Sequence, residues 1–320
     1  MKLRDDVVAL LRCPRCKGPL GPVEGGRIRC ADTACGGDFP IVSDRPVLIA
    51  EERSVFSHAD YGPIAEPRPG PPGPIARLRE WARHVPSPSV NLSAVRCFEK
   101  MRNELLARTA SPLVVVVGGG VMGKGMHALT SVPGIRLVNV DPSPGSEALV
   151  FCDGHDLPFA DGCVDGIVVQ AVLEHVADPV RCVEEIHRVL GPGGIVYSEI
   201  PFMQQVHQYG YDFTRFSLLG HRRLFRRFAE IESGAVAGPG SALAWAWRYF
   251  VAGFAPSRAV ARVVAWLARI TAMLVEQTDY LFGQRPGALD GAACTYFLGT
   301  KSDQTVSDRA LVASYRGVQR

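Results

Sequence analysis

The middle of the chain alternates between short apolar runs, rich in β-branched residues, and segments with helical periodicity. A helix is predicted from Pro179 to Leu190, between two of these runs. Strands that alternate with helices indicate a mainly parallel sheet covered on both faces, so the pattern favours a doubly wound α/β fold. The runs expected to form buried strands are 114–117, a stretch ending at Val140, one ending at Cys152, 164–169 and 195–200.

A second apolar region occupies residues 241–282. Helical spacing predicts two helices there, 241–254 and 257–282, placed between strands at 229–238 and 292–301. Several arginines interrupt the region, so no uncharged run reaches the roughly 20 residues of a membrane span. A substrate lid, a homodimer face and a peripheral membrane contact remain open as alternative roles for these helices.

Composition and charge bear on the expected binding partners and on the cellular compartment. The chain has 320 residues, with 35 Lys and Arg against 32 Asp and Glu, so its charge gives no reason to expect nucleic-acid binding. The opening residues MKLRDDVVALLR are charged throughout, unlike a secretory signal. Nine cysteines, an odd number, favour reduced thiols, and we expect a cytoplasmic protein.

Four of the cysteines lie close together near the N-terminus. Cys13 and Cys16 enclose a Pro-Arg pair, and Cys30 and Cys35 follow a hairpin predicted at Gly25-Gly26. Two thiolate pairs brought together by a hairpin supply the sulfur ligands that zinc favours, and the metal replaces the core that so small a unit lacks. Four protein ligands close the site, which predicts a structural Zn²⁺. Two disulfides and a redox Cys-x-x-Cys pair are the alternatives.

The residues around and after these cysteines also resemble a known family. Residues 7–50, from LLRCPRCKGPL to FPIVSDRPVLI, resemble the small zinc-ribbon family that includes the activator subunit of tRNA and protein methyltransferases. We therefore expect a zinc-ribbon domain over residues 1–52. Residues 53–91 are rich in proline and glycine, which predicts an extended linker.

The glycine-rich stretch after the first central strand has the spacing of a nucleotide-binding turn. Gly118, Gly120 and Gly123 satisfy the dinucleotide fingerprint, and Asp141 stands where an acid would accept hydrogen bonds from ribose hydroxyls. An NAD-dependent oxidoreductase is therefore one interpretation. Glycine-rich turns of this type also serve S-adenosylmethionine, so the choice depends on the downstream motifs.

The downstream motifs favour S-adenosylmethionine. In their order and spacing they resemble the class I S-adenosylmethionine-dependent methyltransferases over about residues 111–202. The resemblance implies a Rossmann-like sheet of seven strands, with the last one antiparallel between the fifth and the sixth. The motifs that carry it are DGHDLPF at 153–159, LEHV at 173–176 and RVLGPGG at 188–194.

The same resemblance implies which residues hold the cofactor, S-adenosyl-L-methionine. The three glycines would border its methionine and ribose parts, and Asp141 would bind the ribose hydroxyls. At the adenine, the implied contacts are Asp153 and Gly154. Gln170 and Leu173 would line the methionine side.

The expected methyltransferase domain spans residues 92–301. It contains a helical insertion at about 239–285, and residues 302–320 are expected to form a flexible tail. One position departs from the family pattern, because Val116 stands where an acid usually helps to hold the cofactor's ammonium. A non-catalytic, methyltransferase-like interaction module therefore stays open as an alternative.

The acceptor side is predicted in the segment after the fifth strand. Loops at the carboxyl ends of a parallel sheet build the ligand crevice in such folds, and this one contains His207, Tyr211 and Asp212. His207 is the candidate general base, because its unperturbed pKa lies near neutrality. Tyr211 and Asp212 are candidates to orient the histidine or the substrate. We expect methyl transfer to a small-molecule or metabolite acceptor.

Overall fold

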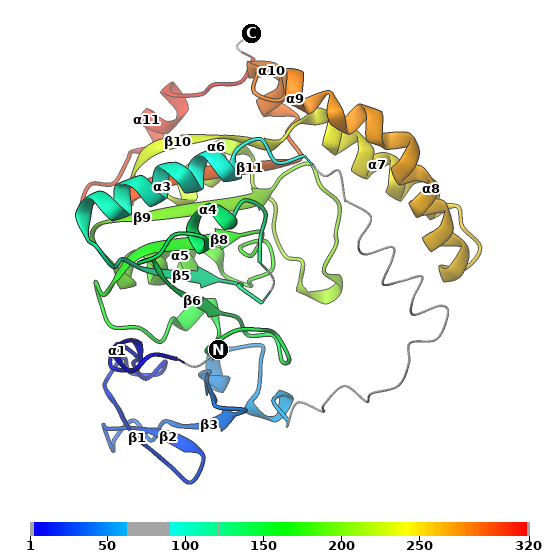
Figure 1. Cartoon of the computed structure of the whole chain (residues 1–320). Helices are drawn as coiled ribbons and strands as arrows, with labels where there is room; N and C mark the ends of the chain where they lie inside the picture. Colours follow the sequence, from blue (N-terminus) through cyan, green and yellow to red (C-terminus); the bar gives the residue numbers. More distant parts are fainter. Residues whose placement is uncertain (1–2, 63–89, 121, 319–320) are drawn as a thin grey trace.

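The computed structural model describes residues 3–62, 90–120 and 122–318, and it consists of an α/β body with a small N-terminal unit attached (Figure 1). The body contains a six-stranded sheet in the order β10-β11-β9-β8-β5-β6. Strands β6, β5, β8 and β9 are parallel, and β11 lies antiparallel between β9 and β10, as predicted for the last strand. The strands are β5 (Leu113–Val117), β6 (Arg136–Val140), β8 (Val164–Gln170), β9 (Leu190–Pro201), β10 (Phe228–Ala237) and β11 (Cys294–Lys301).

Strand β5 shows how helices cover both faces of this sheet. Val114 and Val116 pack in one core cluster with α3 (Ala94–Arg108) and α4 (His127–Thr130). Val115 and Val117 belong to a second cluster, which includes α5 (Pro179–Val189). Successive residues of a strand point to opposite faces, so an all-valine strand is suited to burial on both. The mixed α/β fold expected from the alternating pattern is therefore confirmed.

The N-terminal unit continues into a short strand of the body. Its elements form a sheet in the order β1-β2-β3-β4-β7, in which β4 pairs in parallel with β7 through Val47–Phe151 and Leu48–Cys152. A single bridge, Val140–Val150, joins this stretch to β6. The elements are α1 (Asp5–Val8), β1 (Leu20–Glu24), β2 (Arg27–Cys30), β3 (Asp38–Val42), β4 (Arg45–Leu48) and β7 (Phe151–Cys152).

The large sheet thus has six strands, not the predicted seven. The expected third strand is only the two-residue β7, and β4 occupies its edge. The two units also share one hydrophobic core, in which Leu11, Phe39 and Leu48 pack in the same cluster as Val138 and Phe159 of the body. The N-terminal unit is therefore joined to the body by backbone pairing and by apolar packing.

Two segments predicted to lack regular structure are ordered in part. Most of the predicted linker, residues 63–89, lies outside the described residues, but its first part contains the short 3₁₀ helix His58–Asp60 and a buried Tyr61. The predicted flexible tail contains α11 (Asp308–Ala313), where Leu311 is buried. Asp308 also forms a surface ion pair with Arg223 of α6 (Leu218–Leu224). Sequence polarity alone did not indicate these contacts.

The helical insertion forms a hairpin of α7 (Pro239–Gly253) and α8 (Arg258–Gln277), which extends from one end of the sheet (Figure 1). Its base is fixed by the buried Asp279, whose carboxylate accepts hydrogen bonds from the backbone N–H groups of Gly238, Gly240 and Ser241. Among the described residues, no helix has both the length and the apolar character needed to cross a bilayer. The short helices α9 (Asp279–Phe282) and α10 (Pro286–Asp290) lead back to β11.

The buried His221 of α6 makes a testable prediction about stability. Its ring nitrogens lie 3.0 Å from Ser198 Oγ and from Thr295 Oγ1, and burial lowers the pKa of His221 to about 3. The unfolded chain takes up a proton near the ordinary histidine pKa, whereas the folded chain does not, so this residue reduces stability as pH falls. We expect it to contribute a loss of about 2 kcal/mol between pH 7 and pH 5.

Urea denaturation at both pH values checks this expectation. His221→Gln keeps a donor and an acceptor but cannot titrate, so the pH dependence of its unfolding free energy should be smaller than that of wild type by this amount. An equal dependence in the two proteins would contradict the assignment.

Candidate functional site

The predicted glycine turn and Asp141 meet at the carboxyl ends of β5 and β6. The backbone N–H of Gly120 donates a hydrogen bond to Asp141 Oδ2 at 3.1 Å, and the N–H of Ser143 donates to Oδ1 at 2.7 Å. A Cβ on Gly120 would lie 2.8 Å from Asp141 Oδ2, and one on Gly123 would lie 2.1 Å from Gln170 Oε1. Gly118 also has a positive φ of 70°. The backbone of Gly118 therefore requires glycine, and a side chain at Gly120 or Gly123 would displace Asp141 or Gln170.

Asp153 and Gly154 follow β7 at the same edge. The carboxylate of Asp153 accepts hydrogen bonds from the His155 ring at 2.5 Å and from the Ser54 hydroxyl at 2.5 Å. Burial raises the pKa of this carboxyl, but the hydrogen bonds from His155 and Ser54 outweigh that effect and lower the pKa overall. Gly154 leaves room around its backbone, because a Cβ there would meet atoms only at 3.5 Å and beyond.

The segment 54–61 brings residues to this edge that the sequence did not indicate. Ser54 binds Asp153, and the hydroxyl of Tyr61 donates to the carbonyl of Pro142, next to Asp141. The ring of Phe56 stacks on Tyr211 at a centroid distance of 5.7 Å. This part of the predicted linker thus contacts the adenine, ribose and acceptor ends of the expected cofactor site.

Gln170 lies at the carboxyl end of β8 and joins a buried polar group. Its Nε2 donates to Glu199 Oε1 at 3.0 Å, and the same oxygen accepts from the Tyr197 hydroxyl at 2.6 Å and from Asn91 Nδ2 at 3.1 Å. Burial raises the pKa of Glu199, although these hydrogen bonds partly oppose the shift. Glu199 was not predicted, because a single acid in an apolar strand has no sequence pattern of its own.

Two predicted positions lie in the core. Leu173 is almost fully buried and packs in the cluster that contains α5, so its side chain faces the interior. Val116 is buried in the cluster on the α3 side, which agrees with an apolar residue at that position.

The predicted catalytic residues come together in the loop after β9. The N–H of His207 donates to Asp212 Oδ2 at 2.9 Å, and Arg215 forms an ion pair with Asp212. The hydrogen bond from Arg215 is the main reason why the pKa of Asp212 is lowered to about 2. Asp212 is therefore a fixed carboxylate that positions the His207 backbone. The side chain of Tyr211 is turned toward Phe56 and is largely exposed.

A buried acid that the sequence did not reveal, Glu174, lies beside this loop. Its side chain is fully buried, and burial raises its pKa to about 8. The Nε2 atoms of His175 and His207 lie 3.5 and 3.7 Å from Glu174 Oε1. The motif LEHV therefore places one acid and one histidine against the predicted catalytic histidine.

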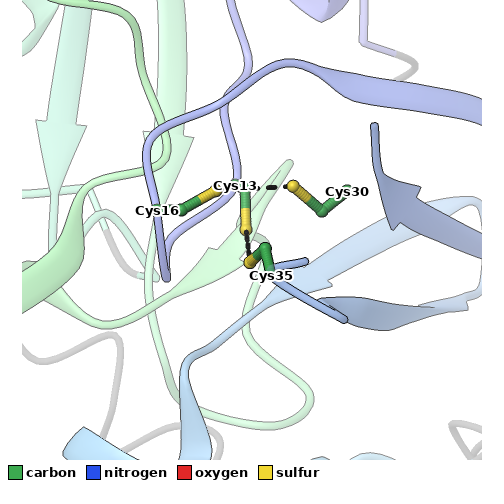
Figure 2. A group of neighbouring side chains, drawn as sticks. All are labelled: Cys13, Cys16, Cys30 and Cys35. Carbon is green, nitrogen blue, oxygen red and sulfur yellow. Dashed lines mark hydrogen bonds between the residues drawn. The ribbon is translucent and has the colours of Figure 1, made fainter. Parts of the chain in front are cut away.

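The four N-terminal cysteines converge as predicted (Figure 2). The distance from Cys13 Sγ to Cys35 Sγ is 3.7 Å, and that from Cys16 Sγ to Cys30 Sγ is 3.4 Å. All four Sγ atoms lie within 4.8 Å of one another. A tetrahedron with Zn–S bonds of about 2.3 Å has edges of about 3.8 Å, whereas a disulfide would need about 2.05 Å. The donor set therefore fits Zn²⁺.

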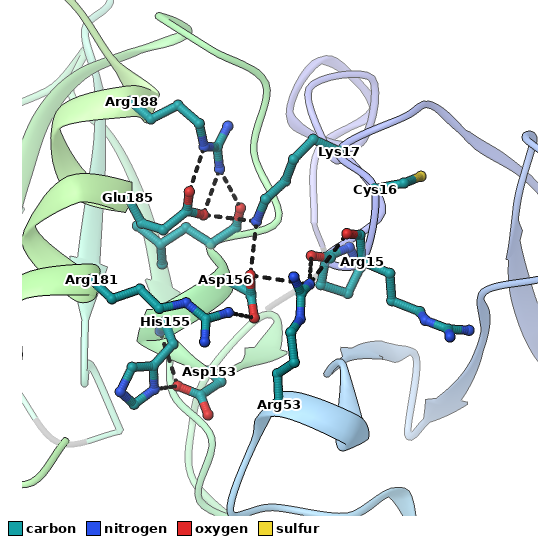
Figure 3. Close-up of polar contacts among 12 residues, drawn as sticks. Arg15, Cys16, Lys17, Arg53, Asp153, His155, Asp156, Arg181, Glu185 and Arg188 are labelled. Carbon is teal, nitrogen blue, oxygen red and sulfur yellow. Dashed lines mark hydrogen bonds and ion pairs between the residues drawn. The ribbon is translucent and has the colours of Figure 1, made fainter. Parts of the chain in front are cut away.

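A partly buried ionic network ties this cysteine knuckle to the expected cofactor edge (Figure 3). The Asp156 carboxylate forms ion pairs with Lys17 at 3.4 Å, Arg53 at 3.3 Å and Arg181 at 2.5 Å. Lys17 also pairs with Glu185 of α5 at 2.8 Å. Asp156, which lies within the DGHDLPF motif, thus joins the two units through ion pairs.

The central part of the chain is similar to known methyltransferase sequences. Residues 116–198 match a family described as a methyltransferase domain. An uncharacterized methyltransferase of Mycolicibacterium gilvum is 39% identical over 99 residues, or 27% of this chain and 38% of that protein. One of Mycobacterium sp. (strain KMS) is 40% identical over 93 residues, or 26% and 36%. The chain thus spans little more than a third of these relatives. The matches support methyl transfer as the chemistry of the domain.

Several solved structures resemble the chain at low identity. One is the complex of the Haloferax volcanii Trm112 methyltransferase activator with a proposed methyltransferase (TM-score 0.39, 24% identity, 65% of this chain and 91% of that chain). Another is Haemonchus contortus phosphoethanolamine N-methyltransferase 2 in complex with phosphomonomethylethanolamine and S-adenosylhomocysteine (TM-score 0.39, 14% identity, 65% and 57%).

The cysteine cluster gives a prediction about metal content. Cys13→Ser removes a buried sulfur ligand, so we expect it to lower bound zinc by one equivalent per chain and to make the N-terminal unit more sensitive to limited proteolysis. Elemental analysis of purified protein measures the first effect. Cys163→Ser, which changes a thiol outside the cluster, should keep all the zinc. Wild-type protein purified without zinc would contradict the assignment.

Proposed function

We propose that the chain transfers a methyl group from S-adenosyl-L-methionine to a small-molecule acceptor. The observation that supports this most directly is the meeting of the Gly118–Gly123 turn, Asp141 and Gln170 at the carboxyl ends of three adjacent parallel strands. Ligands of doubly wound folds bind at that edge. These residues also lie within the part of the chain that matches a methyltransferase domain.

In this proposal each part of the cofactor has a partner. Asp141 binds the ribose hydroxyls, since each of its oxygens has a lone pair left beside its backbone hydrogen bond. Asp153 and the backbone of Gly154 bind the adenine. The Gln170–Glu199 pair supplies the buried polar group on the methionine side, where Val116 has no charge to offer.

The reaction is an in-line displacement at the methyl group, for which the cofactor supplies the electrophilic sulfonium. The protein contributes chiefly by holding the acceptor in line, and well-oriented placement can lower a barrier by about 7–11 kcal/mol. Helix α7 closes the acceptor side, since the ring of Trp245 lies 6.0 Å from that of His207 and the Tyr249 hydroxyl donates to the Val206 carbonyl. We assign this hairpin the role of a lid. His207 is the candidate to accept a proton from the acceptor.

The N-terminal zinc is structural in this proposal. Its four ligands leave no open position, and the knuckle supports Lys17 and Arg53, which hold Asp156 beside the cofactor edge.

Calorimetric titration with S-adenosylhomocysteine and, separately, with NADH tests the cofactor. We expect S-adenosylhomocysteine to bind and NADH not to bind. Binding of NADH alone would replace the proposal by a dinucleotide-dependent oxidoreductase, and binding of neither would indicate a non-catalytic interaction module.

Asp141→Ala should weaken S-adenosylhomocysteine binding by about 10- to 100-fold, because hydrogen bonds to a charged group contribute about 1.5–3 kcal/mol. Asp303→Ala is the matched control, because it removes an exposed carboxylate that follows β11 at the end of the sheet opposite the glycine turn. Unchanged affinity in Asp141→Ala, with a normal unfolding curve, would show that the ribose lies elsewhere.

A further inference from the structure

The carboxylate of Glu174 is buried without a hydrogen-bond partner among the described residues. Its side chain is fully inaccessible. A buried carboxylate that is neither hydrogen-bonded nor paired is costly, so such groups are normally compensated by a cation or a proton. The nearest side chains with ring nitrogens are His175 and His207, both at the edge of the acceptor loop.

Both imidazoles are held in the orientation of metal ligands. His175 Nδ1–H donates to the carbonyl of Tyr211 at 2.7 Å, and His207 Nδ1–H donates to the carbonyl of Gln205 at 3.2 Å. With the proton on Nδ1, each ring has its lone pair on Nε2, the atom that faces Glu174. Backbone carbonyls commonly fix the tautomer of metal-binding histidines in this way.

The distances also suit ligands of one ion better than hydrogen bonds. The two Nε2–Oε1 separations of 3.5 and 3.7 Å are too long for strong hydrogen bonds. Two ligands at about 2.1 Å from the same metal lie about 3.0–3.4 Å apart, which a small side-chain movement would reach. One ligand atom from each of the three residues lies within 4.8 Å of the others. Three lone pairs that converge without a donor favour a cation between them.

We propose that Glu174, His175 and His207 form a second metal site, which takes a first-row divalent cation such as Zn²⁺. Two imidazoles and one carboxylate are a donor set suited to this class of ion. Because three protein ligands leave a coordination position free, the ion can bind an oxygen of the acceptor or a water. The neighbouring Arg215–Asp212 ion pair holds the loop that carries His207.

The catalytic consequence rests on the proposed function, whereas metal binding does not. One lone pair on His207 Nε2 cannot bind a metal and accept a proton at the same time. With the ion bound, an acceptor hydroxyl coordinated to it would be the more acidic group, and His207 would serve as a ligand.

Cobalt substitution separates this site from the cysteine cluster. Metal-free protein is titrated with Co²⁺, and both the bound equivalents and the thiolate-to-cobalt charge-transfer band are recorded. We expect two equivalents in the wild type. Glu174→Gln and His207→Ala should each bind one and keep the full thiolate band, because the second site should weaken by about 100-fold or more on loss of a ligand.

His127→Ala, which removes an exposed histidine of α4, is the matched control and should bind two equivalents. One equivalent in the wild type, or two in Glu174→Gln, would overturn the proposal and leave Glu174 as a protonated buried acid. Titration of the same samples with S-adenosylhomocysteine keeps the two proposals apart: cofactor binding without the second metal would reject only this site, and the reverse result would reject only the proposed cofactor.

Discussion

The parallel pairing of β4 with β7 is the constraint on which the expected cofactor edge depends. Strand β7 has two residues, which pair with Val47 and Leu48 of the N-terminal unit, and the preceding Leu149 and Val150 form backbone hydrogen bonds with the end of β6. Asp153 follows β7 directly, and Ser54, which follows β4 closely, donates to it. The two units therefore together build the edge at which we expect the adenine, with the shared apolar core as their common support.

Ion pairs also join the N-terminal unit to the body. Asp156 is surrounded by one lysine and two arginines, which come from the cysteine knuckle, the segment after β4 and α5. A carboxylate buried to this degree needs cationic partners, because an unpaired buried charge is strongly destabilising. The knuckle that carries the four cysteines is thereby linked to α5 of the body through Lys17, Asp156 and Glu185.

The features that could be predicted from the sequence are those encoded by local patterns. The alternation of apolar runs and helices indicated the α/β fold, the cysteine spacing indicated the cluster, and the glycines with Asp141 indicated one edge of the sheet. Glu174, Glu199 and Ser54 could not be found in this way, because their importance comes from residues distant in sequence. The same holds for β4 on β7 and for α11, since pairing partners and buried faces are decided by tertiary packing.

Strands β4 and β7 belong to one chain, so their association is an intramolecular equilibrium and not a binding equilibrium between two molecules. Their association is the closure of a loop, and its entropic cost rises only slowly with the length of the intervening chain. Occupation of the β7 edge is then independent of protein concentration, and dilution does not release it. Val47 and Phe151 are nonetheless far apart in sequence, so this contact raises the contact order and belongs among the slower steps of folding. Until it forms, β7 is an exposed edge open to wrong partners.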